Sequence, residues 1–190
     1  TNAKMDSYYI SASATYSLTP DLYCGRKFFL GRQDPSESRK PEKEDGKERR
    51  IHVISAAGLL ETSHRDLTLD YDILMKACLK LTGDFQEIEK LYRLMCFNVF
   101  AHNRDDHAKN FSFLYDEPEK RWKLSPAYDL TYSHSIGGEH ATSVHGNGKN
   151  PAAEDLLGVA SQIGMDKKQA IRIAQNVQEC VREYLRKYLS

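Results

Sequence analysis

The chain has no excess of charge of either sign, because 27 basic and 27 acidic side chains cancel at neutral pH. Domains that bind nucleic acid or an anionic membrane through their overall field usually carry a clear basic excess. The sequence also lacks an apolar run of about 18 residues, which a membrane-spanning helix needs. Its polar beginning, TNAKMDSYYISAS, has no apolar segment of the kind that secretory signals contain. We therefore expect a cytoplasmic protein with no direct nucleic-acid or membrane binding.

Cysteine is also sparse, and the four cysteines are widely spaced, without a CxxC pair. Closely paired cysteines are typical of structural metal sites and of small disulfide scaffolds, so neither is favoured here. Three of the four, Cys78, Cys96 and Cys180, fall in apolar helical patterns, where a buried free thiol is the common outcome. This usage indicates a reducing compartment.

The 190 residues can bury one core and show no internal repeat, which predicts a single domain. Residues 26–34, RKFFLGRQD, have a short apolar run between charges and are typical of a strand. In residues 38–50, SRKPEKEDGKERR, ten of thirteen side chains are charged with both signs mixed, which predicts a solvated loop.

Helical periodicity dominates the remainder of the chain. Apolar residues recur at three-to-four spacing before Gly83, which supplies a stop: Leu69, Ile73, Leu74, Ala77, Cys78 and Leu81. Asp84 and Glu87 have the spacing of a capping box, and a strongly apolar helix of about five turns is expected after them.

The segments beyond this helix predict one hairpin, one long loop and two more helices. Residues 111–125 are expected to form a β-hairpin around the turn-rich DEPEK. Residues 133–150 are rich in glycine and histidine and are expected to form a long loop. Two helical patterns follow, the second opened by Asp166 and Gln169 in capping-box spacing. The fold class is therefore mainly α with a small β-hairpin.

The stretch AHNRDDHAKNFSFLY, residues 101–115, concentrates chemically active side chains between the apolar helix and the hairpin. Phosphoryl transfer needs a carboxylate that orients the attacking hydroxyl and oxygen ligands that hold magnesium on the phosphates. Protein kinases supply these as Arg-Asp, four residues, Asn, and then a second Asp after a hairpin. Here Asp105, Asn110 and Asp129 follow that order. Asp105 would be the catalytic base, and Asn110 and Asp129 the magnesium ligands at the open end of the hairpin.

Neighbouring residues leave alternatives open. Asp106 could be the base in place of Asp105 or could cap a helix, but only Asp105 has the five-residue offset to Asn110. His107 is expected to support the loop by hydrogen bonding more than to act in catalysis. Lys109 could neutralise phosphate charge or pair with an aspartate. His102, at the end of the apolar helix, is expected to be a satisfied core histidine.

The histidines suggest a rival, a metal-dependent phosphohydrolase. His140 and His145 could be combined with Asp105, Asp106 and His107 as ligands. However, both histidines lie in a glycine-rich loop and not one turn apart on a helix. The nearby GNGK lacks the remainder of a phosphate-binding loop motif and is not interpreted as one.

The chain resembles the HipA-like kinases, the toxins of bacterial toxin–antitoxin pairs. FNVFAHNRDDHAKNFSFLY, WKLSPAYDLTYS and GEHATSVHGNGKNPAAEDLLGVA are similar, in order, to that family's catalytic-loop, metal-binding and C-terminal segments. RIHVISAAGLLE and LDYDILMKACLKLTGD fit its middle region. The resemblance covers most of residues 51–180, while residues 1–50 match only loosely. It implies that residues 1–190 form the C-terminal lobe of a bilobal kinase-like fold, with 51–190 as the helical core.

The resemblance also implies an activity, cofactors and partners. Family members are serine/threonine protein kinases that use ATP and Mg²⁺, act on substrates that include aminoacyl-tRNA synthetases, and are commonly held by a DNA-binding antitoxin. By resemblance, Asp105 would be catalytic and Asn110 and Asp129 would bind magnesium. The family's N-terminal lobe, with its phosphate-covering loop and ATP-contacting lysine, has no counterpart in the matched segments. We therefore expect this chain alone not to be active as a kinase. The alternative is a non-catalytic, kinase-derived module that binds an antitoxin or another protein.

Overall fold

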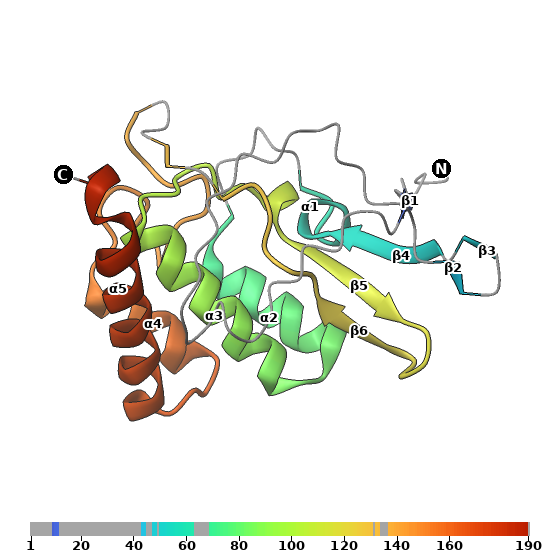
Figure 1. Ribbon diagram of the computed structural model, residues 1–190. Coiled ribbons are helices and arrows are strands. Elements are labelled where there is room, and N and C mark those ends of the chain that lie inside the picture. The colour runs from blue at the N-terminus through green and yellow to red at the C-terminus, as the bar shows by residue number, and fades with distance from the viewer. Residues whose placement is uncertain are drawn as a thin grey trace.

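The computed structural model describes residues 9–11, 43–44, 47–48, 50–62, 69–130, 132–133 and 137–189. Short strands and a short helix come first, and the hairpin then lies between two pairs of longer helices in the chain order (Figure 1). The elements are β1 Tyr9–Ser11, β2 Lys43–Glu44, β3 Lys47–Glu48, β4 Arg50–Ser55, α1 Ala56–Leu59, α2 Tyr71–Thr82, α3 Phe85–Phe100, η2 Ala108–Asn110, β5 Ser112–Asp116, β6 Arg121–Leu124, α4 Ala153–Gln162 and α5 Lys167–Leu189. No helix in these described ranges combines the length and apolar character needed to cross a bilayer.

An antiparallel sheet lies beside the helices, with strand order β1-β4-β5-β6. The expected hairpin is confirmed, since β5 and β6 pair from Phe113 with Leu124 to Asp116 with Arg121. Strand β4 was not predicted from its sequence, RIHVIS. It pairs with β5 through Ile54 and Phe113, and its last residue, Ser55, caps α1 by accepting a hydrogen bond from the Gly58 amide.

The prediction of a continuous loop over residues 38–50 is wrong in part. Strands β2 and β3 form a two-residue antiparallel ladder, with Lys43 opposite Glu48 and Glu44 opposite Lys47. Residue 50 already belongs to β4. The strand expected at residues 26–34 lies outside the described residues.

Helix α2 ends at Gly83 as predicted but presents a rotated face to the core. The Asp70 carboxylate accepts a hydrogen bond from the Asp72 amide at the start, and Gly83 ends the helix in the left-handed conformation. The buried residues are Tyr71, Leu74, Met75 and Cys78. Ile73, expected in the core, is 49% exposed. Tyr71 faces inward because its hydroxyl bonds a buried carboxylate described below, and this orientation turns Ile73 towards solvent.

Both predicted capping boxes form only their N-cap half. Asp84 accepts from the Gln86 amide, and Asp166 accepts from the Gln169 amide. The buried Glu87 carboxylate does not reach back to its own helix start. It accepts a hydrogen bond from the Leu124 amide at 2.9 Å and thereby joins α3 to β6.

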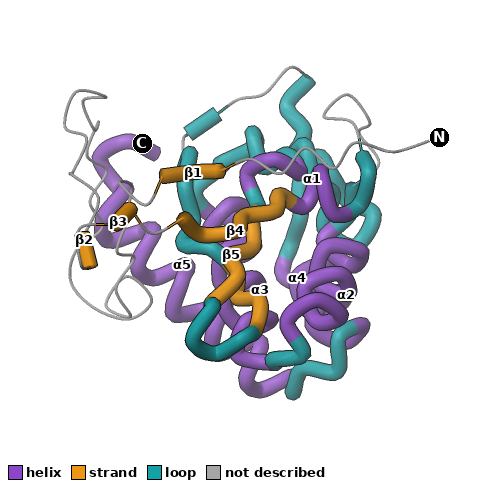
Figure 2. Tube along the Cα trace, turned by 90° about the vertical axis from the view of Figure 1, so that its right-hand side faces the viewer, coloured by secondary structure: helices purple, strands orange, loops and turns teal. Residues whose placement is uncertain are grey.

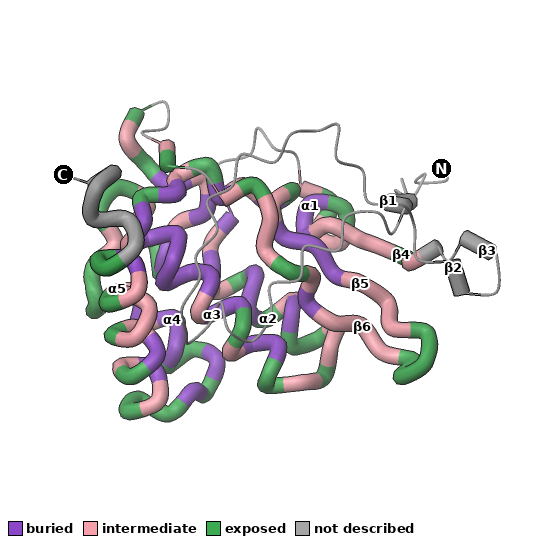
Figure 3. The backbone as a smooth tube through the Cα atoms, viewed as in Figure 1, coloured by how far each residue is buried: buried purple, intermediate pink, exposed green. Residues whose placement is uncertain are grey.

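Helix α3 runs through the centre of the core, between α2 and α5 (Figure 1, Figure 3). Ten of its sixteen residues are buried, including Leu91, Tyr92 and Met95. Cys78 and Cys96 are buried free thiols, as predicted, and burial raises the pKa of each to about 12. A helix so enclosed gives a rigid support for the loop that follows its C-terminal end.

Candidate active site

The candidate site begins where α3 ends. The amide of Ala101 still donates to the Phe97 carbonyl, and His102 then takes a positive φ of 52°. A left-handed residue reverses the chain direction in one step. The chain leaves the helix through residues 103–107 and passes into the short 3₁₀ turn η2 before β5. His102 is exposed and stacks edge-on with Tyr132, which corrects the expectation of a core histidine.

Asp105 and Asn110 are joined by a hydrogen bond that closes the loop between them. The Asn110 side-chain nitrogen donates to the Asp105 carbonyl at 2.7 Å, and its backbone amide donates to the His107 carbonyl at 2.8 Å. The Asn110 side-chain oxygen remains as an acceptor. The Asp105 side chain is 57% exposed, and its carboxylate lies 3.9 Å from the His107 Nε2 atom. The five-residue spacing thus presents one carboxylate and one amide oxygen from a closed loop.

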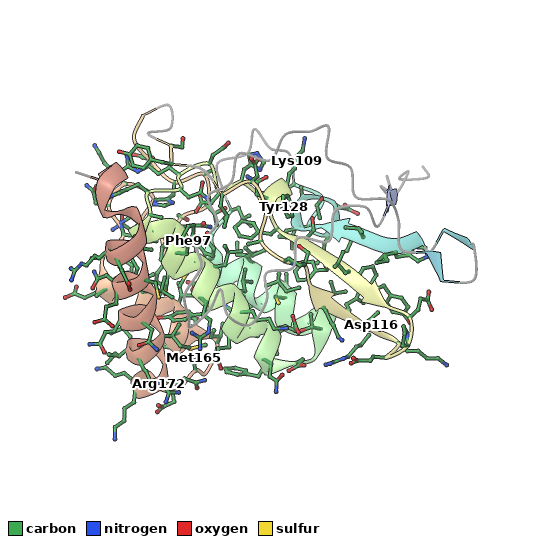
Figure 4. The ribbon with its side chains drawn as sticks, viewed as in Figure 1. Phe97, Lys109, Asp116, Tyr128, Met165 and Arg172 are labelled. Carbon is green, nitrogen blue, oxygen red and sulfur yellow. The ribbon has the colours of Figure 1, made fainter. Side chains whose placement is uncertain are left out.

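The segment that carries Asp129 runs beside this loop. The Tyr128 hydroxyl donates to the Lys109 carbonyl and lies 2.7 Å from the Ser112 hydroxyl. Five residues further on, the Ser133 amide donates to the His102 carbonyl at 3.1 Å. Figure 4 shows Lys109 and Tyr128 together at the opposite end of the hairpin from Asp116. Asn110 and Asp129 therefore lie in adjacent segments at the open end of the hairpin, where the sequence predicted them.

Asp129 has an unusual backbone conformation. Its φ of 54° lies in the left-handed region, which L residues other than glycine, asparagine and aspartate seldom adopt. The side chain is exposed. Such outliers persist only where neighbouring contacts hold them, and here the Tyr128 and Ser133 bonds flank the residue.

Asp106 faces the opposite way from Asp105 and is fully buried. Its carboxylate accepts from the Tyr71 hydroxyl at 2.9 Å, from His140 Nδ1 at 3.0 Å and from the Thr142 amide at 3.2 Å. Its backbone carbonyl accepts from the Thr142 hydroxyl at 2.5 Å. With all these donors around it, Asp106 has no access to a substrate hydroxyl and does not cap a helix.

A chain of polar side chains extends this contact into the core. The Asn98 side-chain nitrogen donates to the Tyr71 hydroxyl, and the Asn103 side-chain nitrogen donates to the Asn98 side-chain oxygen, each at 2.9 Å. Burial, and then the charge of Asp106, raise the pKa of Tyr71 well above its ordinary value. The sequence interpretation missed this network. Asn98 inside an otherwise apolar helix was the available signal, since a buried amide requires partners.

The remaining candidates are placed less decisively. Lys109 is exposed, and its backbone carbonyl accepts the hydrogen bond from the Tyr128 hydroxyl. His107 is partly buried, and its Nδ1 atom has no hydrogen-bond partner in the described part of the chain.

The rival metal site gains no support from the geometry. His140 Nδ1 is engaged by Asp106, whereas His145 Nδ1 is engaged by Asp72 at 2.9 Å, beside the start of α2. The Asp72 carboxylate raises the pKa of His145. Among the described residues, no group of three or more histidine, cysteine, aspartate or glutamate side chains could hold a metal ion.

Comparison with known proteins gives a family and a similar fold. The sequence matches the HipA-like C-terminal domain family over residues 16–184. The fold is similar to a HipA structure from Shewanella oneidensis MR-1, solved as a complex of the toxin–antitoxin proteins HipA and HipB with operator DNA. The TM-score is 0.62 at 15% identity, and the match covers 77% of this chain but 39% of that one. Comparison with curated proteins gave no match.

The fold is thus an α+β lobe similar to part of that HipA structure, with a small antiparallel sheet against a helical core. The chain belongs to the HipA-like C-terminal domain family.

Proposed function

We propose that the chain is the catalytic lobe of a serine/threonine protein kinase that transfers the terminal phosphoryl group of ATP to protein hydroxyls. The observation that carries the proposal is the joining of the predicted site residues at one end of the hairpin. Asn110 bonds the Asp105 carbonyl, and Tyr128, next to Asp129, bonds the Lys109 carbonyl. The loop that carries Asp105 and Asn110 is thereby hydrogen-bonded to the segment that carries Asp129, 19 residues beyond Asn110.

In this proposal Asp105 is the catalytic residue. Its exposed carboxylate orients a serine or threonine hydroxyl and accepts the proton as the hydroxyl oxygen bonds the terminal phosphorus. The bond from that phosphorus to the ADP oxygen breaks in the same step. Asp106 is not proposed as the base, because its carboxylate is enclosed.

Asn110 and Asp129 are proposed as the magnesium ligands. Magnesium prefers hard oxygen donors, and these residues offer an amide oxygen and a carboxylate. The Asn110 nitrogen is already bonded to Asp105, so the amide oxygen is the atom left to face a metal. Magnesium, when bound, neutralises charge on the transferred phosphate. Lys109 is exposed beside these ligands and could add a further positive charge.

Partners and location extend the proposal from the family and the solved complex. An aminoacyl-tRNA synthetase is the proposed kind of protein substrate, and a DNA-binding antitoxin is the proposed partner. A cytoplasmic location fits both. The chain spans well under two thirds of the similar HipA chain, so this chain alone is proposed to bind ATP weakly, and tight binding with phosphoryl transfer to require a second lobe that covers the phosphates from above.

Magnetic resonance of the isotope-labelled chain tests the metal site. Mg²⁺ with ATP should shift the amide signals around Asn110 and Asp129, and Asp129→Ala should abolish the shifts. Glu117→Ala, an exposed change in the hairpin turn, is the matched control and should leave them intact. Shifts that survive Asp129→Ala would contradict the assignment. Absence of shifts in the unaltered chain, together with tight binding of a protein partner, would favour the non-catalytic module.

A transfer assay tests the need for the second lobe. The purified chain should label no protein with ATP and Mg²⁺, whereas adding the N-terminal lobe of a related kinase should allow labelling. Robust labelling by the chain alone would show that one lobe is sufficient.

A further inference from the structure

Residues 103–107 belong to no helix or strand, yet consecutive backbone carbonyls in this stretch are hydrogen-bonded. The carbonyls of Asp105 and His107 accept from Asn110, as described above. The Arg104 carbonyl accepts from the Ala141 amide at 3.0 Å, and the Asp106 carbonyl accepts from the Thr142 hydroxyl at 2.5 Å. Donors from residues 141–142 thus alternate along the loop with donors from Asn110.

The side chain of Asp106 adds a second attachment to the same partner segment. His140 and the Thr142 amide both donate to its carboxylate, and Tyr71 donates from α2. Asp106 and His140 side chains are 0% and 2% exposed. Buried polar groups with all partners present hold a unique arrangement, because any displacement leaves a donor or acceptor without a partner in a region of low dielectric.

Residues 140–142 are themselves held to the body of the lobe. The Ser143 hydroxyl and the Gly146 amide both donate to the Asp70 carboxylate at the start of α2, at 2.6 and 2.7 Å. The His140 amide donates to the Gly148 carbonyl at 2.7 Å. A glycine-rich segment is therefore a rigid support for the loop that carries Asp105.

We propose that Asp106 is a positioning residue for phosphoryl transfer, and that Thr142 and His140 act through it to orient Asp105 and Asn110. The Asp105 side chain is 57% exposed whereas the adjacent Asp106 side chain is 0% exposed, so anchoring Asp106 inward directs Asp105 outward. Alignment within a fraction of an ångström governs the rate of such a reaction, and a supporting contact outside the reacting atoms can set it. The binding of ATP with Mg²⁺ is the one readout of this inference that rests on the proposed function; hydrogen exchange does not depend on it.

A pair of substitutions at Thr142 separates positioning from packing. Thr142→Val keeps the volume but removes the hydroxyl bonded to the Asp106 carbonyl, whereas Thr142→Ser keeps the hydroxyl and removes a methyl group. If the contact positions the loop, Thr142→Val should be impaired and Thr142→Ser should restore function. If the residue only fills space, the order should reverse, because Thr142 is fully buried.

Hydrogen exchange without ligand gives the first readout. Thr142→Val should speed exchange of the Asn110 amide on the order of tenfold, the equivalent of one net hydrogen bond, and Thr142→Ser should leave it within about twofold. The Met95 amide, inside α3, reports opening of the whole lobe and should not change. Equal acceleration at both amides would overturn the inference. If Thr142→Val does not fold, Tyr71→Phe removes a different donor to Asp106 and should loosen Asn110 selectively.

Binding of ATP with Mg²⁺ gives the second readout. The dissociation constant should rise on the order of tenfold in Thr142→Val and recover in Thr142→Ser. Equal binding by wild-type protein and Thr142→Val would overturn the positioning role while leaving the proposed function standing. Absence of binding in the wild-type protein would overturn the proposed function, and hydrogen exchange would still decide whether Thr142 holds the loop.

Discussion

Two adjacent aspartates should respond in opposite ways to the same conservative change. Asp105→Asn alters an exposed side chain that makes no hydrogen bond through its carboxylate in the described structure. Asp106→Asn alters a carboxylate that three buried donors face. We expect the first substitution to preserve stability and remove catalysis, and the second to destabilise the lobe.

The donor geometry sets the size of the effect at Asp106. Tyr71 and His140 converge on one carboxylate oxygen, and the Thr142 amide faces the other. An asparagine can direct its oxygen at the first pair, but its NH₂ group then opposes the Thr142 N–H. A buried donor without a partner costs about 1 to 3 kcal/mol, and loss of the negative charge weakens the remaining bonds. We expect a loss of about 2 to 4 kcal/mol in the free energy of unfolding.

Urea unfolding, followed by circular dichroism, measures this difference. Asp105→Asn should stay within about 0.5 kcal/mol of wild type, as is usual for exposed positions. Asp106→Asn should lower the melting temperature by roughly 4 to 16 °C, given about 2 to 4 °C per kcal/mol for a domain of this size. With a second lobe present, Asp105→Asn should retain its fold but lower transfer by roughly 10² to 10⁴. Equal stability of the two variants would refute the assignment of inward and outward roles.

Two further predictions concern titratable groups outside the loop. The hydrogen bond to the Asp72 carboxylate raises the pKa of His145, so Asp72→Asn should return this pKa towards its ordinary value in an imidazole titration by magnetic resonance. The stabilisation from this contact is complete below the unfolded-state pKa of His145 and is lost as the pH rises through the folded-state pKa. An unchanged titration in Asp72→Asn would show that the contact is absent in solution. Burial raises the pKa of Cys78 and Cys96 to about 12. Both thiols should therefore react with a disulfide reagent at pH 8 only when the protein opens. Rapid reaction of either thiol in the folded protein would contradict the core packing.

Local patterns in the sequence predicted those features that depend on near neighbours. Gly83 ends α2, and Asp84 and Asp166 cap the starts of the next helices they were assigned to, as the sequence predicted. These contacts are made within one or two turns of chain, so residue type and spacing suffice to identify them.

Patterns that compete with distant partners were predicted only in part. Glu87 and Gln169 have the spacing for capping boxes, yet Glu87 bonds the Leu124 amide and the Gln169 side chain bonds Glu89 at 2.8 Å. A helix start exposed to water can leave an amide to solvent, whereas a buried strand amide cannot. The carboxylate therefore serves the buried donor, and nothing in the local sequence indicates that this donor exists.

The two aspartates are the sharpest case of this limit. Spacing alone favoured Asp105 as the base, but the partners that enclose Asp106 come from residues 34 to 36 positions later and 35 positions earlier. The later partners lie in a stretch whose glycines and histidines predicted a loop, and its described residues 137–150 belong to no helix or strand of the structure.

That loop owes its order to carboxylates that lie on other elements. Asp70 receives Ser143 and Gly146, Asp72 receives His145, and Asp155 receives the Asn147 side chain at 3.0 Å. Glycine supplies the close approach in one place, where a Cβ on Gly158 would lie 2.5 Å from the His145 ring. Side chains that usually indicate a solvated loop here act as donors to acidic groups of the core and its helix ends. Because such donors and acceptors meet only after the helices have packed, the rigidity of the segment that supports Asp105 is a property of the fold and not of the segment's composition.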